Sequence, residues 1–143
     1  MSGLQCLLYM SQATRAMSPA EIDRLLHGAR ERNRLRGITG ALLCYDGRFV
    51  QVLEGEAAAV EQCFTLIQSD PRHERITPLH RGPIEAARFP EWSMRYVTLE
   101  GPGDRAVAAF LDQLQRQPTP ETVKQAITLL HRLASASADS PAR

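Results

Sequence analysis

Short apolar runs and helix-like stripes alternate along most of this chain. The strand-like runs are brief and rich in aliphatic residues, whereas the helix-like segments carry apolar residues three and four positions apart. Asp46-Gly47 separates two of the strand-like runs and is a strong signal for a two-residue hairpin. Strands are therefore expected at 4–10, 38–45, 49–54, 76–80 and 93–99.

Two helices are expected between these strands. The first begins at Ser18-Pro19-Ala20-Glu21, which supplies an N-cap, a proline in the first turn and the glutamate of a capping box. It should end near Gly37, and a second helix repeats apolar residues from Val60 to Ile67 before Asp70-Pro71 stops it. The order βαββαββ predicts an α+β, ferredoxin-like fold, with two helices on one face of an antiparallel or mixed sheet.

Two amphipathic C-terminal helices are expected at 104–117 and 120–135. Neither can bury its apolar stripe alone, so the pair must cover the open face of the sheet, pack together or meet another subunit. We expect one domain over 1–100, then a helical hairpin and a frayed tail over 101–143, with the tail from Ala134. No attached effector domain is expected after this hairpin.

Composition restricts the class of protein. The chain has 143 residues, 43% hydrophobic and 23% charged, as expected for one globular domain. A net charge of +1 gives no bulk attraction to nucleic acid or membranes, and no apolar run approaches the roughly 18 residues of a membrane span. The cysteines Cys6, Cys44 and Cys63 lack metal-type spacing, so we expect free thiols, a cytoplasmic protein and no metal site.

Three polar side chains interrupt positions that should face the core. Asn33 closes the apolar stripe of the first helix, Gln51 alternates with Phe49 and Leu53, and Tyr9 lies inside the first strand. An unpaired buried polar group costs about 1–3 kcal/mol. Each group could bond to the backbone. Together they favour a ligand with alternating donors and acceptors, such as a flavin or a pterin, without deciding between the two.

Charged and aromatic residues near the helix ends have simpler interpretations that stay open. A basic cluster ends the first helix and is either a solvated face or a clamp for ligand phosphates: Arg30, Arg32, Arg34 and Arg36. Asp70, Arg72 and His73 follow the second helix and would fit an ion-paired turn. Trp92 and Met94 precede the last strand, where core-edge residues are normal.

Five ordered segments carry a family resemblance. They are Leu8-Tyr9-Met10-Ser11, Asn33 ahead of Gly37-Ile38-Thr39-Gly40, 49–55, Asp70-Pro71-Arg72-His73 and 88–94. Together these segments resemble the BLUF family, the sensors of blue light using FAD, over about residues 3 to 99. The resemblance implies a ferredoxin-like fold that holds the isoalloxazine ring between its two helices.

The resemblance also implies a role for each matching residue. Tyr9 would donate an electron and a proton, and Gln51 would rotate or tautomerise, so that the hydrogen bonds to the flavin are rearranged. Trp92 and Met94 would exchange places near Gln51 and pass the signal to the last strand and the C-terminal helices. The implied flavin-binding residues are Tyr9, Leu25, Ala29, Arg30, Arg32, Asn33, Phe49, Gln51, Ile67, Asp70, Arg72 and His73.

The cofactor would be FAD, with FMN or riboflavin as substitutes. Related sequences often carry Asn or His where this chain has Arg32, which favours contact with ribose or phosphate there. The implied protein is a blue-light photoreceptor and not an enzyme. It would signal to a downstream protein, form homo-oligomers and bind neither nucleic acid nor membrane. If the chain after 101 were deleted, the photocycle would stay and the oligomeric state would change.

Three other classes compete with this interpretation. An RNA-binding module is suggested by Gly47-Arg48-Phe49-Val50, but aromatic residues make up only 6% of the chain and its charge is near zero. A flavin-dependent oxidoreductase needs an acid–base or nucleophile pair beyond Tyr9 and Gln51. A purely structural dimerisation domain gives no reason for these two side chains to face inward.

Overall fold

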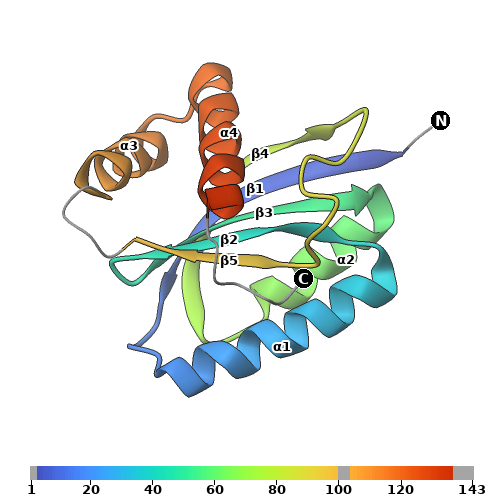
Figure 1. Cartoon of the computed structure of the whole chain (residues 1–143), viewed down its shortest axis with the longest axis horizontal. Coiled ribbons are helices and arrows are strands. Elements are labelled where there is room, and N and C mark those ends of the chain that lie inside the picture. The colour runs from blue at the N-terminus through green and yellow to red at the C-terminus, as the bar shows by residue number, and fades with distance from the viewer. Residues whose placement is uncertain (1–2, 100–103, 137–143) are drawn as a thin grey trace.

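The helices and strands occur in the predicted order. The computed structural model describes residues 3–99 and 104–136, and Figure 1 shows a twisted sheet between two pairs of helices. The elements are β1 (Leu4–Ala13), α1 (Pro19–Arg36), β2 (Thr39–Tyr45), β3 (Arg48–Glu56), α2 (Ala57–Gln68), β4 (His73–Pro83), β5 (Arg95–Thr98), α3 (Arg105–Arg116) and α4 (Pro120–Ala136). The predicted α+β class with two C-terminal helices is confirmed.

The sheet is mixed, with strand order β4-β1-β3-β2-β5. Neighbouring strands are antiparallel except β5, which runs parallel to β2. The register sets Tyr9 of β1 opposite Gln51 of β3, and Gln51 opposite Leu42 of β2. Because directly opposed residues share a face of the sheet, these three side chains form one row across its middle.

Local chemistry fixes the hairpin and the first helix. Asp46 and Gly47 have φ values of 52° and 72°, the positive pair that a type I′ turn between β2 and β3 requires. Ser18 and Glu21 form the expected capping box, in which Glu21 N–H donates to Ser18 Oγ at 3.2 Å. Gly37 adopts the left-handed conformation at φ 69° and ends α1.

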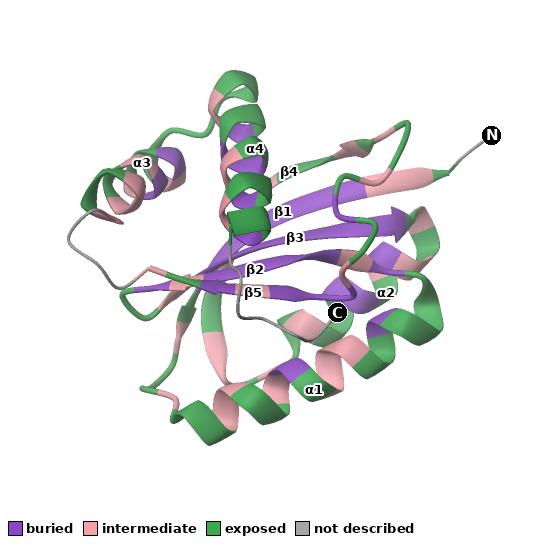
Figure 2. Ribbon diagram, viewed as in Figure 1, coloured by how far each residue is buried: buried purple, intermediate pink, exposed green. Residues whose placement is uncertain are grey.

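Each face of the sheet has its own apolar core, as the buried strands in Figure 2 illustrate. α1 and α2 cover one face, where their side chains pack on Leu7, Leu42 and Leu53. The C-terminal helices cover the opposite face, with Leu111 of α3 and Leu130 of α4 buried. Of the three arrangements open to these helices, covering the sheet therefore occurs, and α3 and α4 also contact each other.

Several predicted boundaries were wrong by a few residues. α4 continues to Ala136 and the side chain of Ala134 is fully buried, so the tail does not begin at Ala134. β4 is longer than 76–80 because it pairs along most of β1, whereas β5 is shorter than 93–99. The rest of the expected tail, 137–143, and the break near 101 lie outside the described residues. Within 3–99 and 104–136, no helix is long and apolar enough to cross a membrane.

Candidate functional site

A small cavity lies between α1, α2 and the sheet face that they cover. Its volume is about 50 Å³. The side chains that line it come from four strands, the helices α1 and α2 and the turn after α2: Tyr9, Leu25, Leu42, Phe49, Gln51, Ile67, Asp70, Arg72 and His73. Residues far apart in the sequence thus meet where the sequence placed its candidate ligand site.

Three buried side chains beside this cavity are joined in a hydrogen-bonded chain. The Tyr9 hydroxyl donates to Gln51 Oε1, and Gln51 Nε2 donates to Met94 Sδ at 3.3 Å. Burial raises the pKa of Tyr9 well above its usual range, and nearby Cys63 and Asp70 raise it further. The phenol therefore keeps its proton at physiological pH and can act as the donor of this chain.

Asn33 and Arg30 of α1 hold the backbone that leads into β5. Asn33 Nδ2 donates to the Ser93 carbonyl at 2.6 Å, and the Cys63 thiol lies 3.8 Å from Asn33 Oδ1. Arg30 Nε donates to the Met94 carbonyl at 2.9 Å. Two side chains of one helix thus fix two successive carbonyls beside the Tyr9–Gln51 chain.

His73 is oriented by two hydrogen bonds. Its Nε2 lies 2.7 Å from the Ile67 carbonyl, and its Nδ1 lies 2.8 Å from Ser11 Oγ. Because a carbonyl can only accept, Nε2 carries a proton and donates it to Ile67, while Nδ1 exchanges a hydrogen bond with the Ser11 hydroxyl. The ring is therefore held edge-on toward Tyr9 and Phe49, at centroid distances of 6.3 Å from both.

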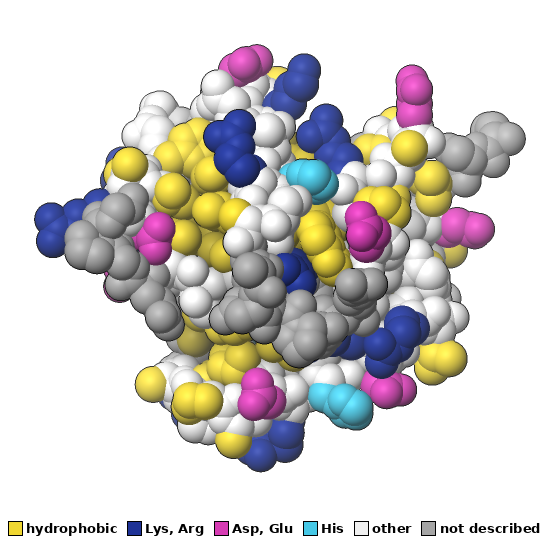
Figure 3. Space-filling model, viewed as in Figure 1, with side chains coloured by type: hydrophobic (Ala, Val, Ile, Leu, Met, Phe, Trp, Pro, Cys, Tyr) yellow, Lys and Arg dark blue, Asp and Glu magenta, His cyan; other side chains and the backbone are white. Residues whose placement is uncertain are grey.

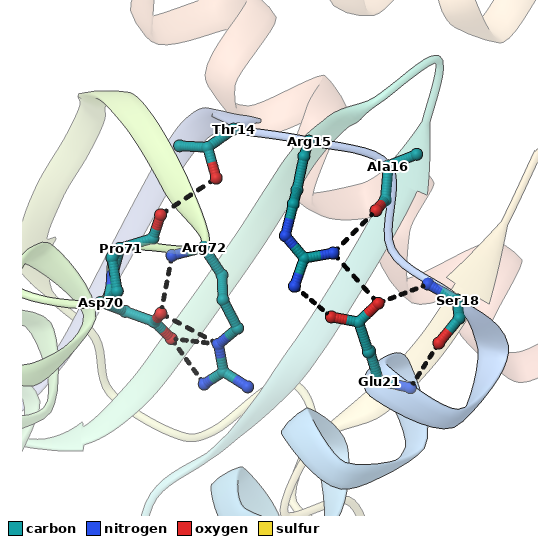
Figure 4. A network of polar contacts seen from close by, with 8 residues as sticks. All are labelled: Thr14, Arg15, Ala16, Ser18, Glu21, Asp70, Pro71 and Arg72. Carbon is teal, nitrogen blue, oxygen red and sulfur yellow. Dashed lines mark hydrogen bonds and ion pairs between the residues drawn. The ribbon is translucent and has the colours of Figure 1, made fainter.

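An ion pair occupies the mouth of the cavity. Arg72 binds Asp70 through Nη2 at 2.7 Å and through its backbone N–H at 2.9 Å, and Figure 4 shows this pair beside Thr14. Burial alone would raise the pKa of the Asp70 carboxyl, but the bonds from Arg72 outweigh it and lower the pKa. Thr14 ties the loop after β1 to this turn through the Pro71 carbonyl. The charged groups of Asp70 and Arg72 are therefore held in place at the mouth of the cavity.

Eight of the twelve flavin-binding residues expected from the sequence line the cavity. Ala29, Arg30, Arg32 and Asn33 do not line it; Arg32 is exposed, and Arg30 and Asn33 bind backbone next to Gln51. Leu42 was missed, although its position opposite Gln51 follows from the hairpin register. A flavin contact at any of these positions stays a prediction.

Met94 and Trp92 occupy opposite faces of the sheet. Met94 is fully buried against Gln51, in the core under α1 and α2. Trp92 packs instead against Phe89 and His131 of α4, at centroid distances of 6.3 and 6.1 Å. Of the two, Met94 is the neighbour of Gln51 in this structure.

Among the described residues, no group of three or more His, Cys, Asp or Glu side chains could hold a metal ion. The site instead offers a row of hydrogen-bond donors and acceptors. Its central amide can exchange donor and acceptor by turning over, which changes what it presents to a ligand edge without making a covalent bond.

A family model matches this chain over residues 4–95, and its description is "Sensors of blue-light using FAD". A subunit of a photoactivated adenylate cyclase from Euglena gracilis, subunit beta, is 41% identical over 98 residues. The match covers 68% of this chain and 11% of that subunit, so the chain spans about a tenth of the length of this curated relative.

Solved structures that resemble this chain include the following three proteins, which share its fold. The dark-state structure of BlrB, a BLUF protein, has a TM-score of 0.74 and 38% identity, covering 96% of this chain and 98% of BlrB. The ground state of BlsA gives a TM-score of 0.77 at 29% identity, covering 90% of this chain and 87% of BlsA. Klebsiella pneumoniae BlrP1 with FMN and cyclic diGMP gives 0.68 at 36% identity, covering 93% of this chain and 35% of BlrP1.

Proposed function

This chain belongs to the BLUF family of blue-light sensors, and on that basis we propose that Tyr9 and Gln51 form its light-operated hydrogen-bond switch. A BLUF domain is a sensor module, so the RNA-binding and oxidoreductase interpretations are not favoured. The observation that carries the proposal is the buried chain from the Tyr9 hydroxyl through the Gln51 amide to Met94 Sδ.

The residues of the cavity suit a flavin ring. An isoalloxazine edge alternates carbonyl and N–H groups, which match the donor and acceptor of the Gln51 amide. Ligand pockets usually measure about 300–1,000 Å³, far more than the 50 Å³ enclosed here. Binding therefore requires the walls to part, chiefly at Leu25 of α1 and Ile67 of α2, which are both only half-buried.

The switch follows from the chemistry of an amide. When bound, the flavin would supply the absorption of blue light, and it would take an electron and a proton from Tyr9 and return both, so that only the hydrogen bonds around it differ afterwards. The proton on Tyr9 Oη lies on a direct hydrogen bond to Gln51 Oε1 and moves along it. Rotation or tautomerisation of the amide then exchanges its donor and acceptor, and this exchange is the stored signal.

Met94 responds because a thioether sulfur can accept a hydrogen bond but cannot donate one. In the first orientation, Gln51 Nε2 donates to Met94 Sδ. In the exchanged orientation, an amide oxygen faces the sulfur and two acceptors meet. Met94 must then move, and since it adjoins β5, the rearrangement reaches the last strand of the sheet.

An absorption spectrum of the protein purified in darkness tests this proposal. The wild-type protein should be yellow and shift reversibly to longer wavelength after blue light, because a new hydrogen bond to the ring lowers its transition energy. Gln51→Ala should abolish the shift. Gln68→Ala, at the exposed end of α2, is the matched control and should keep it. A wild-type protein that is colourless and takes up no added flavin would contradict the proposal.

We propose FAD as the flavin, in keeping with the description of the family. The exposed Arg32 of α1 is available for the ribose or the phosphates, and arginine suits phosphate oxygens because it binds them through two N–H groups. Equilibrium binding of FAD, FMN and riboflavin tests this choice. FAD should bind most tightly, and Arg32→Ala should remove most of its advantage over riboflavin. Equal affinities would contradict the choice of FAD.

We propose that the output is contact with a downstream protein or a second copy of this chain, made through the outer surface of α3 and α4. A groove of about 430 Å³ lies there, with Phe110 and Leu129 among its lining residues. Figure 3 shows apolar side chains on this side of the molecule, with basic side chains beside them. Light scattering in darkness and under blue light would detect the association of two copies of this chain.

The free thiols of the described residues support a reducing, cytoplasmic setting.

A further inference from the structure

Arg95 begins β5 and directly follows Met94. Successive residues of a strand point to opposite faces, so Met94 lies under α1 and α2 whereas Arg95 faces α4. Only 7% of Arg95 is exposed, and its Nε donates to the Ala134 carbonyl of α4 at 3.1 Å. A buried guanidinium thus joins the residue after the switch to a helix on the other side of the sheet.

Arg95 binds α4 near the end of its described part. Ala134 lies in the last described turn of this helix, which runs to Ala136. A cation near a helix C-terminus is favoured by the helix dipole. Arg95 therefore holds this turn from the sheet, and the contact is called the cap below.

Aromatic rings enclose this cap. The Arg95 guanidinium lies over the Trp92 ring at 5.1 Å. His131, one turn before the cap, lies 6.1 Å from Trp92 and 5.4 Å from Phe89. The segment before β5 and the last turns of α4 consequently pack as one unit around Arg95.

The backbone beside Met94 is held from the other side. Asn33 binds the Ser93 carbonyl, Arg30 binds the Met94 carbonyl, and Gly40 N–H donates to the Trp92 carbonyl at 3.0 Å. Because three successive carbonyls are held, this segment moves as one unit. A displacement that reaches the Met94 backbone therefore also shifts Arg95.

We propose that Arg95 is a positioning residue that couples Met94 to the C-terminal turn of α4. In darkness its hydrogen bond to the Ala134 carbonyl keeps that turn helical. In the light, displacement of Met94 draws Arg95 away, and the last turn of α4 frays. This coupling rests on the proposed Tyr9–Gln51 switch, which supplies the displacement.

Hydrogen exchange of the flavin-loaded protein, in darkness and under blue light, tests the coupling. In the wild type, amides near the end of α4 should exchange about fivefold faster in the light, the effect of losing one hydrogen bond. In Arg95→Gln, these amides should already exchange at the fast rate in darkness, and light should add little. The red shift of the flavin should remain.

Arg48→Gln is the matched control. Arg48 of β3 also carries a guanidinium that joins the sheet to a C-terminal helix, through Asp112 of α3. Its loss should leave the light response of α4 intact. Arg95→Lys keeps the charge near Trp92 but lacks the planar guanidinium, so its α4 amides should show an intermediate light response. This variant tests the coupling if Arg95→Gln does not fold.

The outcomes separate the coupling from the switch. A normal red shift with an unchanged light response of α4 in both Arg95 variants would overturn the role of Arg95. A normal red shift in a wild-type protein whose α4 shows no light response would overturn it as well. A wild-type protein without a red shift would instead overturn the switch itself.

Discussion

Two polar side chains of β3 are buried on opposite faces of the sheet and suit opposite tasks. Gln51 accepts one bond and donates one, so its amide can turn over. Glu54 accepts from the Thr39 hydroxyl at 2.9 Å and from the backbone N–H groups of Arg88 and Phe89 at 2.8 and 2.6 Å. Both oxygens of Glu54 accept hydrogen bonds, and a carboxylate has no donor to exchange with them. Glu54 therefore holds the segment before β5, whereas Gln51 has the donor and acceptor that the proposed switch requires.

Glu54→Gln should therefore reduce stability. The amide keeps the shape of the carboxylate but turns an NH₂ group toward a backbone N–H, leaving buried donors without an acceptor. We expect the free energy of unfolding to fall by about 1–3 kcal/mol. Urea unfolding measures this loss. Glu56→Gln, two residues on and exposed, should change stability by less than about 0.5 kcal/mol. Equal effects of the two changes would contradict this role of Glu54.

Sequence patterns reveal some of these residues and hide others. Tyr9 and Gln51 stand out because strand alternation places a polar group on a face that is otherwise apolar. Glu54 and Arg95 do not stand out, because a charged residue near the end of a strand usually faces solvent. Their backbone partners lie 34 to 39 residues away, in an irregular segment and in the last described turn of α4, which no local pattern encodes.

Among the elements, those with local start and stop signals were predicted most closely. The hairpin turn needs positive φ at two residues, and Asp46-Gly47 supplies them. The start of α1 follows from its capping box. β4 was predicted too short, because it is an edge strand with many exposed residues and its length depends on pairing with β1.

The first turn of α1 should make stability depend on pH. The Arg15 guanidinium and the backbone N–H of Ser18 bind the Glu21 carboxylate and lower its pKa to about 2, from an ordinary value of 4.5; Figure 4 shows these contacts. Because the pKa is lower in the folded state, ionised Glu21 stabilises the fold above pH 4.5. This contribution is lost as the pH falls from 4.5 toward 2.

Urea midpoints of the wild type and of Glu21→Gln test this dependence. The wild type should be the more stable at pH 6, and the difference between the two midpoints should be smaller at pH 3. The Arg15 side chain is 65% exposed, so salt should also reduce the difference. A difference that is the same at both pH values would show that the ion pair does not act on α1.

For the molecule as a whole, the sheet separates the candidate site from the C-terminal helices. The candidate site lies under α1 and α2, and the C-terminal helices cover the other face. The two C-terminal helices shield strand residues such as Leu8, Val50 and Val52, which are fully buried. Sequence alone left open what these helices cover, because an amphipathic stripe does not identify the surface that it meets.

Deletion of the residues after 101 should uncover that face. The red shift of the flavin should persist, since every proposed switch residue precedes the deletion. The exposed apolar face should drive self-association, because patches of several hundred Å² rarely stay free in water. Light scattering measures the size of the particle. A shortened protein with the same oligomeric state as the full chain would contradict this expectation.

The most direct test of the Tyr9–Gln51 switch compares two tyrosines. Tyr45 is buried like Tyr9, but it lies on the opposite face and its hydroxyl bonds to Asp112. Light-minus-dark absorption spectra should show the reversible red shift in the wild type and in Tyr45→Phe, and no shift in Tyr9→Phe with its flavin bound. A full red shift in Tyr9→Phe would contradict the switch.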